Sequence, residues 1–159
     1  MKIVILRHGE AETYVDNDAQ RQLTDHGREQ ARGAGLCLKN LAICFDQVWV
    51  SPYRRAQQTA DGVLSQLGSI PRETLDSLTP DGSPTALVDT LSTYRGGDLL
   101  IISHQPLVSA LTGLLENADY RSGPPMSPAS MALLSADTLL AGCCQLQWLR
   151  HAPTFAAVV

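Results

Sequence analysis

Short apolar runs alternate with longer amphipathic stretches along most of the chain. The runs at residues 3–6, 48–50 and 99–102 have the length of buried parallel strands, and residues 72–75 are expected to add another. Between the first two runs, apolar residues recur at spacings of three and four, as on one face of an α-helix. This alternation predicts βαβ units and therefore an α/β fold with a mainly parallel sheet.

The predicted helices have recognisable starts. A serine or threonine at the N-cap and a proline at the first helical position both favour helix initiation. Thr24 precedes the first helix, Ser51-Pro52 the second and Ser83-Pro84 the third, while Pro106 opens the fourth. We expect these helices to cover residues 24–41, 51–67, 83–94 and 106–115.

Two further strands are expected late in the chain, at residues 130–134 and 145–149, with no helix between them. A pair without a crossover helix is typical of an antiparallel edge. The sequence contains no internal repeat, low-complexity tract or linker. We therefore predict a single three-layer α/β/α domain over residues 1–159, with a mainly parallel sheet and an antiparallel edge.

The composition limits the classes of partner. The formal net charge of the 159 residues is −4, so a basic surface for nucleic acid is not expected and an anion site must be a local positive pocket. Nothing at the N-terminus resembles a signal peptide, and no apolar run approaches the ~20 residues of a membrane span. We expect a cytoplasmic protein with reduced thiols that binds neither nucleic acid nor a membrane, and we favour a monomer.

Charged and nucleophilic side chains follow three of the predicted strands. Arg7-His8-Gly9 ends the first strand, Arg55 lies on the first turn of the helix after residues 48–50, and His104 follows residues 99–102. Ligands of open α/β sheets bind beyond the carboxyl ends of the strands. We therefore expect two arginines and two histidines to converge at one edge of the sheet.

These residue types suit the transfer of a phosphoryl group. Arginine forks bind phosphoryl oxygens two bonds at a time, and helix N-termini add backbone donors. A neutral imidazole such as His8 can attack phosphorus, and a second one, His104, can stabilise the charge that builds on an oxygen. Gly9 would let the backbone approach the phosphoryl group without a Cβ clash.

The same segments resemble the motifs of the histidine phosphatase superfamily. Arg7-His8-Gly9 is similar to its first motif, residues 51–60 (SPYRRAQQTA) to its second and Ser103-His104 to its third. Residues 21–24 (RQLT), with Gly27 and residues 30–31, match the first helix of the family. Together with residues 78–80 (LTP) and the short length, the pattern resembles the SixA-type phosphohistidine phosphatases most closely.

This resemblance implies a two-step mechanism without metal or cofactor. His8 would be the nucleophile, Arg7, Arg55 and His104 would bind the phosphoryl group, and Arg21 would line the groove. The substrate implied is a phosphorylated protein, in particular a histidine phosphotransfer domain of a signalling pathway.

One departure from the family concerns the acid that protonates the leaving group. Many members have a glutamate after the second motif, whereas this chain offers Glu73, Asp76 and Asp81, and no spacing singles one out. An absent acid matters less for a phosphohistidine substrate, because its imidazole has a pKa near the working pH, about 6.5 for a histidine side chain.

Other interpretations of the sequence are a phosphatase of small phosphate monoesters and a phosphate-binding module without turnover. Cys144 and Arg150 have the C-x5-R spacing of cysteine-dependent phosphatases, but residues 145–149 contain no glycine and alternate like a strand, so no phosphate-cradling loop is expected. The sequence contains neither a CxxC pair nor a histidine pair with ligand spacing, so it gives no indication of a metal site. His26, His151 and Arg54 are assigned structural or solvated roles.

Overall fold

The computed structural model describes residues 1–13 and 16–158 and contains a six-stranded mixed sheet. Its strands stand in the order β3-β2-β4-β1-β5-β6. β1, β2, β3 and β4 are parallel to one another, while β5 is antiparallel to β1 and to β6. The antiparallel edge is therefore confirmed. The strands are β1 (Lys2–Arg7), β2 (Gln47–Val50), β3 (Arg72–Thr74), β4 (Leu99–Ser103), β5 (Met131–Ser135) and β6 (Gln145–Arg150).

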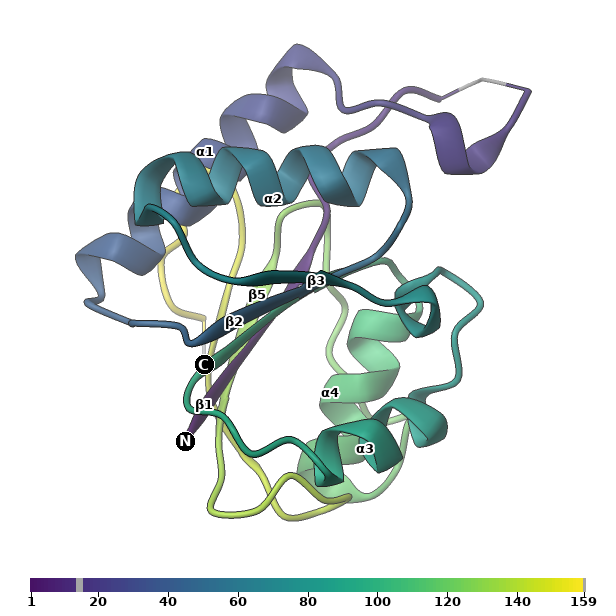
Figure 1. The fold of residues 1–159 in the computed structure, drawn as a ribbon, viewed down its shortest axis with the longest axis vertical. Helices are drawn as coiled ribbons and strands as arrows, with labels where there is room; N and C mark the ends of the chain where they lie inside the picture. The colour runs from purple at the N-terminus through teal and green to yellow at the C-terminus, as the bar shows by residue number, and fades with distance from the viewer. Residues whose placement is uncertain (14–15, 159) are drawn as a thin grey trace.

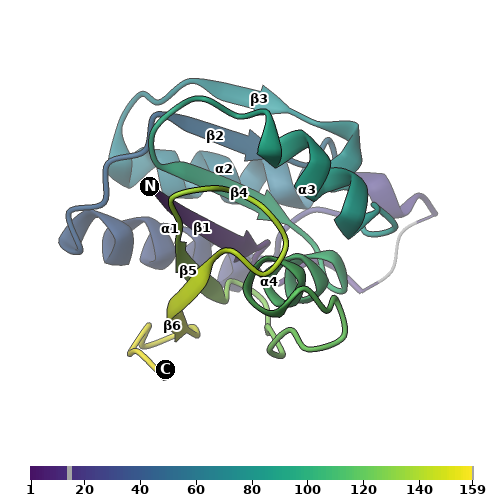
Figure 2. The same ribbon diagram turned by 90° about the horizontal axis from the view of Figure 1, so that it is seen from below.

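Helices cover both faces of the sheet (Figure 1). α1 (Asp25–Asn40) and α2 (Arg54–Leu67) pack together on one face, and α3 (Pro84–Ser92) and α4 (Leu107–Asn117) on the other. In the view of Figure 2, α3 and α4 lie in front of the sheet, and α1 and α2 lie behind it. The three-layer α/β/α architecture predicted from the sequence is confirmed.

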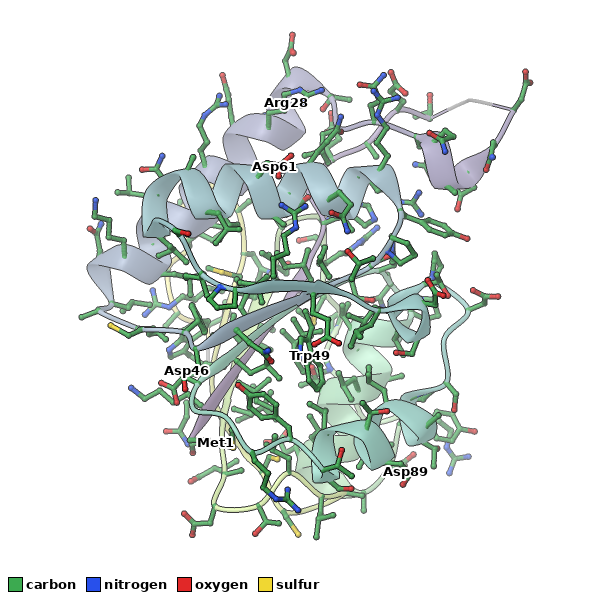
Figure 3. The ribbon with its side chains drawn as sticks, in the orientation of Figure 1. Met1, Arg28, Asp46, Trp49, Asp61 and Asp89 are labelled. Atoms are coloured by element: carbon green, nitrogen blue, oxygen red, sulfur yellow. The ribbon has the colours of Figure 1, made fainter. Side chains whose placement is uncertain are left out.

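Two apolar cores separate the sheet from its helices. Neighbouring residues of a strand point to opposite faces, so Val4 and Leu6 face α1 and α2 whereas Ile3 and Ile5 face α3 and α4. Trp49, on β2, belongs to the same core as Ile3 and Ile5 and lies on the α3 side of the sheet (Figure 3). The strands are therefore packed on both faces, and this packing positions the residues at the strand ends.

The start of the second helix differs from the sequence prediction. α2 begins at Arg54 with Tyr53 at its N-cap, three residues after Ser51. The Ser51 hydroxyl accepts a hydrogen bond from the Tyr53 N–H and lies 2.7 Å from His104 Nε2, so it belongs to the strand-end loop and not to a helix cap. The caps predicted at Thr24 and Ser83 are confirmed, because each side chain accepts from a backbone N–H of its helix.

Two short 3₁₀ turns complete the described chain, η1 (Asp18–Gln20) and η2 (Asp76–Leu78). η1 lies beyond the N-terminal end of α2, on the segment that joins β1 to α1 (Figure 1). Among the described residues, no helix is both long and apolar enough to cross a membrane.

Candidate active site

The carboxyl ends of β1 and β4 place two histidines side by side. The strands are paired so that Arg7 is opposite Ser103, and the His8 N–H donates to the Ser103 carbonyl at 3.0 Å. His8 and His104 each come directly after one of these paired residues, so they lie side by side, and their ring centroids are 5.0 Å apart. The convergence predicted from the strand ends is present.

The tautomer of His8 follows from its neighbours. Its Nδ1 lies 2.6 Å from the Gly9 carbonyl oxygen, which can only accept a hydrogen bond, so Nδ1 holds the proton. Nε2 then has the lone pair, and it accepts from Arg55 Nε at 3.2 Å. A lone pair on Nε2 is what a nucleophilic imidazole requires.

Both histidines are neutral at pH 7. His8 is only 6% exposed, and its burial, together with the nearby guanidinium of Arg55, lowers its pKa to about 3 although the hydrogen bond to Gly9 opposes this. Burial also lowers the pKa of His104 to about 2, with a further contribution from His8.

These depressed pKa values predict a loss of stability in acid. Between pH ~6.5 and ~3 the unfolded chain binds a proton at His8 that the native state does not, so the free energy of unfolding falls as the pH drops. At pH 5 each buried histidine should cost about 2 kcal/mol relative to pH 7. Denaturant titrations at the two pH values should show a smaller difference for His8→Ala than for wild type. The exposed His26→Ala should behave like wild type, and an equal acid loss in all three proteins would contradict the assignment.

His104 presents one ring nitrogen without a partner. Its Nε2 lies 2.7 Å from the Ser51 hydroxyl, and its buried Nδ1 has no hydrogen bond. The hydroxyl accepts from Tyr53 and has its own proton to donate to Nε2; with that bond made, the proton of neutral His104 is on Nδ1. A buried donor without an acceptor is costly, and a phosphoryl oxygen would satisfy it.

Two buried or half-buried arginines border the histidines. The Arg55 side chain, 4% exposed, donates from Nη1 to the Asp18 carbonyl at 2.8 Å and from Nη2 to Asp18 Oδ2 at 3.2 Å, besides its contact with His8. Arg7 donates from Nη1 to the Met126 carbonyl at 2.8 Å, while its buried Nε has no partner. Burial lowers the pKa of both guanidinium groups.

Arg21 lies beside this group and is linked to it by an acid that the sequence did not reveal. Its Nη1 donates to Asp18 Oδ1 at 2.9 Å, and its Nε donates to the Glu12 carbonyl at 2.6 Å. Asp18 thus bridges Arg21 and Arg55. No motif in the sequence singled out Asp18, because one aspartate in a polar loop has no pattern that distinguishes it.

Gly9 allows a close approach between two backbone segments. A Cβ there would lie 2.5 Å from the Gly27 carbonyl oxygen, so the glycine permits close packing against the first turn of α1. Its N–H donates to Thr59 Oγ1 at 3.1 Å, and Thr59 in turn donates to the Arg55 carbonyl at 2.7 Å. Gly9 therefore anchors the nucleophile segment to α1 and α2, and its N–H is already used.

The acids considered as proton donors are not hydrogen-bonded to the histidines. Glu73, Asp76 and Asp81 are all exposed, and none forms a hydrogen bond with Arg7, His8, Arg55 or His104 in the described structure. The hydrogen-bond partner of Asp81 is Thr79, whose hydroxyl donates to it at 2.9 Å.

The C-x5-R segment, Arg54 and two further histidines were given no catalytic role from the sequence. Gln145–Arg150 forms strand β6, so the C-x5-R segment is extended, and burial raises the pKa of Cys144 to about 11, which disfavours a thiolate. Arg54 and His26 are exposed, and His151 contacts the Ser130 hydroxyl. Across residues 1–13 and 16–158, no cluster of three His, Cys, Asp or Glu could hold a metal ion.

Known proteins resemble the chain over most of its length. It is 36% identical over 151 residues to the phosphohistidine phosphatase SixA homolog of Haemophilus influenzae, with 86% of this chain and 89% of that protein covered. It is 35% identical over 135 residues to phosphohistidine phosphatase SixA of Escherichia coli, with 82% and 81% covered. The chain belongs to the histidine phosphatase superfamily. The model of branch 1 of this superfamily matches residues 3–79.

Solved structures of the superfamily share the fold. The structure of the protein histidine phosphatase SixA complexed with tungstate has a TM-score of 0.84 and 30% identity, with 94% of this chain and 96% of that chain covered. The resemblance stated from the motifs is thereby confirmed. His104 lies outside the part matched by the superfamily model, and the pairing of β4 with β1 is what brings it to His8.

Proposed function

We propose that the protein is a phosphohistidine phosphatase that hydrolyses its substrate through a covalent phosphohistidine on His8. The observation that supports this most directly is the state of His8: neutral, buried, protonated on Nδ1 and with the lone pair of Nε2 directed at the arginine cluster. The relatives named phosphohistidine phosphatases point to the same activity.

The reaction has two displacements at phosphorus. Nε2 of His8 attacks, the bond from phosphorus to the substrate nitrogen breaks, and its electron pair stays on the departing ring, which holds a proton on its other nitrogen and therefore leaves as a neutral imidazole. Water then attacks the phosphoryl group, the P–Nε2 bond breaks, and inorganic phosphate leaves as H2PO4⁻ with both protons of the water, while His8 keeps its Nδ1 proton and recovers the lone pair on Nε2. Arg7, Arg55 and His104 Nδ1 would stabilise the charge on the phosphoryl oxygens.

A substrate with a P–N bond does not require any of the three acids considered from the sequence as a proton donor. An alkoxide leaves poorly without a proton donor, whereas an imidazole with a pKa of about 6.5 leaves readily. Among the described residues, Glu73, Asp76 and Asp81, the donors considered from the sequence, form no hydrogen bond with Arg7, His8, Arg55 or His104. The E. coli relative is named for phosphohistidine, which supports the same substrate class.

The partner we propose is a phosphorylated protein, in particular a histidine phosphotransfer domain. The segment between His8 and Thr24 includes only one short 3₁₀ turn among its described residues, and no helical cap follows β1. Enzymes of small substrates often close a lid over the ligand. We further propose one catalytic domain over residues 1–159 that acts in the cytoplasm, where its four free cysteines would remain reduced.

The substrate preference can be measured directly. We expect kcat/KM on a histidine-phosphorylated phosphotransfer domain to exceed that on any of a panel of small phosphate monoesters. A monoester preferred by a factor of about ten, which is roughly 1.4 kcal/mol of transition-state binding, would contradict the protein substrate. Absence of turnover with every compound would instead indicate a phosphate-binding module.

A further inference from the structure

Asp18 forms hydrogen bonds with both Arg55 and Arg21, two arginines that do not belong to a strand end. It lies on η1, close to the N-terminal end of α2 (Figure 1). Its carbonyl and its Oδ2 accept from Arg55, and its Oδ1 accepts from Arg21. The Arg55 side chain is almost completely buried, whereas that of Asp18 is 54% exposed.

The two edges of the Arg55 guanidinium have different partners. A guanidinium offers one pair of donors on the edge formed by Nε and Nη2, and another pair on the edge formed by Nη1 and Nη2. Asp18 occupies the Nη1/Nη2 edge with two acceptors. On the other edge, Nε points at His8 Nε2, the atom that would attack phosphorus.

This division leaves the Nε edge for the phosphoryl group. When a phosphoryl group approaches Nε2, the Nε–H of Arg55 can pass from His8 to a phosphoryl oxygen, which frees the lone pair for attack. The contacts with Asp18 need not change during this exchange. Without them, a guanidinium bound to one atom only could rotate about its side chain and lose its alignment with phosphorus.

The turn that presents Asp18 is itself held in place. Asn17 caps it, since its Oδ1 accepts from the Ala19 N–H at 3.0 Å, and Arg21 donates both to Asp18 and to the Glu12 carbonyl. The hydrogen bond from Arg21 is the main cause that keeps the pKa of Asp18 below its usual value, so the carboxylate is ionised.

We propose that Asp18 is a positioning residue for phosphoryl transfer, which clamps the Nη1/Nη2 edge of Arg55 so that the Nε edge stays directed at the phosphoryl group on His8. This inference rests on the proposed function, because it assigns Arg55 to the phosphoryl oxygens. The ionised oxygen Oδ2 supplies an acceptor, and an uncharged amide oxygen in the same place would supply one as well.

Three variants separate positioning from a structural role of the turn. Asp18→Ala removes the side-chain acceptor and leaves the carbonyl contact. Asp18→Asn keeps an oxygen for Nη2 without the charge, while its amide NH2 replaces the oxygen that accepts from Arg21. Asn17→Ala removes the cap of the same turn without touching Arg55. For each, kcat and KM are measured on a histidine-phosphorylated phosphotransfer domain, and folding is checked by circular dichroism.

We expect Asp18→Ala to lower kcat on the order of tenfold while KM changes less than about threefold, because alignment and not binding is lost. Asp18→Asn should recover kcat to within about threefold of wild type, and Asn17→Ala should match wild type. The inference is overturned if Asp18→Ala retains the wild-type kcat, if Asn17→Ala is equally impaired, or if Asp18→Asn recovers nothing. A wild-type protein without turnover would instead refute the proposed function.

Discussion

Replacing His8 with alanine should abolish turnover, with a loss on the order of 10³-fold or more in kcat, as for the removal of a nucleophile in other enzymes. The nearest nitrogen nucleophile is His104, whose Nε2 is bound to Ser51 and whose ring lies 5.0 Å away at a tilt of 57°. It cannot replace Nε2 of His8 in line with phosphorus. The loss is measured as kcat on a histidine-phosphorylated protein.

The covalent intermediate gives this prediction a second readout. Wild-type protein quenched in mid-reaction should hold an acid-labile phosphoryl group on a peptide that contains His8, and His8→Ala should hold none. His26→Ala serves as the control, because His26 is exposed and its ring is within hydrogen-bond distance of Gln30, outside the candidate site. Label on a cysteine or an aspartate would contradict the mechanism.

The sequence predicted the sheet well because burial on both faces leaves a strong local signal. β4 is buried at all five positions, and its residues 99–102 are all apolar. The caps of α1 and α3 were also predictable, since Thr24 and Ser83 act on backbone N–H groups within three residues. These features depend on neighbours along the chain, which a pattern can reveal.

The start of α2 could not be predicted in the same way. Ser51-Pro52 has the composition of a helix start, but the Ser51 hydroxyl is bound to His104, which is 53 residues away. A long-range polar contact outweighs the local capping preference, whose strength is about 1 kcal/mol. The functional site and not the helix therefore determines the conformation of this loop.

The sequence predicted which residues come together in the candidate site, but not the hydrogen bonds between them. Arg7, His8, Arg55 and His104 converge because parallel strands end at one edge, which the order of elements already implied. The proton on Nδ1 of His8, the free Nδ1 of His104 and the Asp18 bridge depend on side-chain distances between distant segments. No spacing along the chain contains that information.

Replacing Arg55 with lysine should lower kcat/KM on the order of 10²-fold although the charge is kept, by analogy with the loss of a transition-state donor. The guanidinium donates in three directions, to His8 Nε2, to the Asp18 carbonyl and to Asp18 Oδ2. An ammonium group is a point charge without a planar fork, so it cannot hold the Asp18 contacts and meet two phosphoryl oxygens together. The measurement is kcat/KM on a histidine-phosphorylated protein.

The neighbouring arginine provides a matched control for the same substitution. Arg54 is exposed at the first residue of α2, whereas the Arg55 side chain is 4% exposed, so Arg54→Lys makes an identical chemical change one position away and should retain wild-type kcat/KM. Equal losses in both variants would mean that the start of α2, and not the fork of Arg55, is sensitive to substitution. Near-normal activity of Arg55→Lys would show that charge alone suffices, and the role of Arg55 as a bidentate ligand of the phosphoryl group would then be wrong.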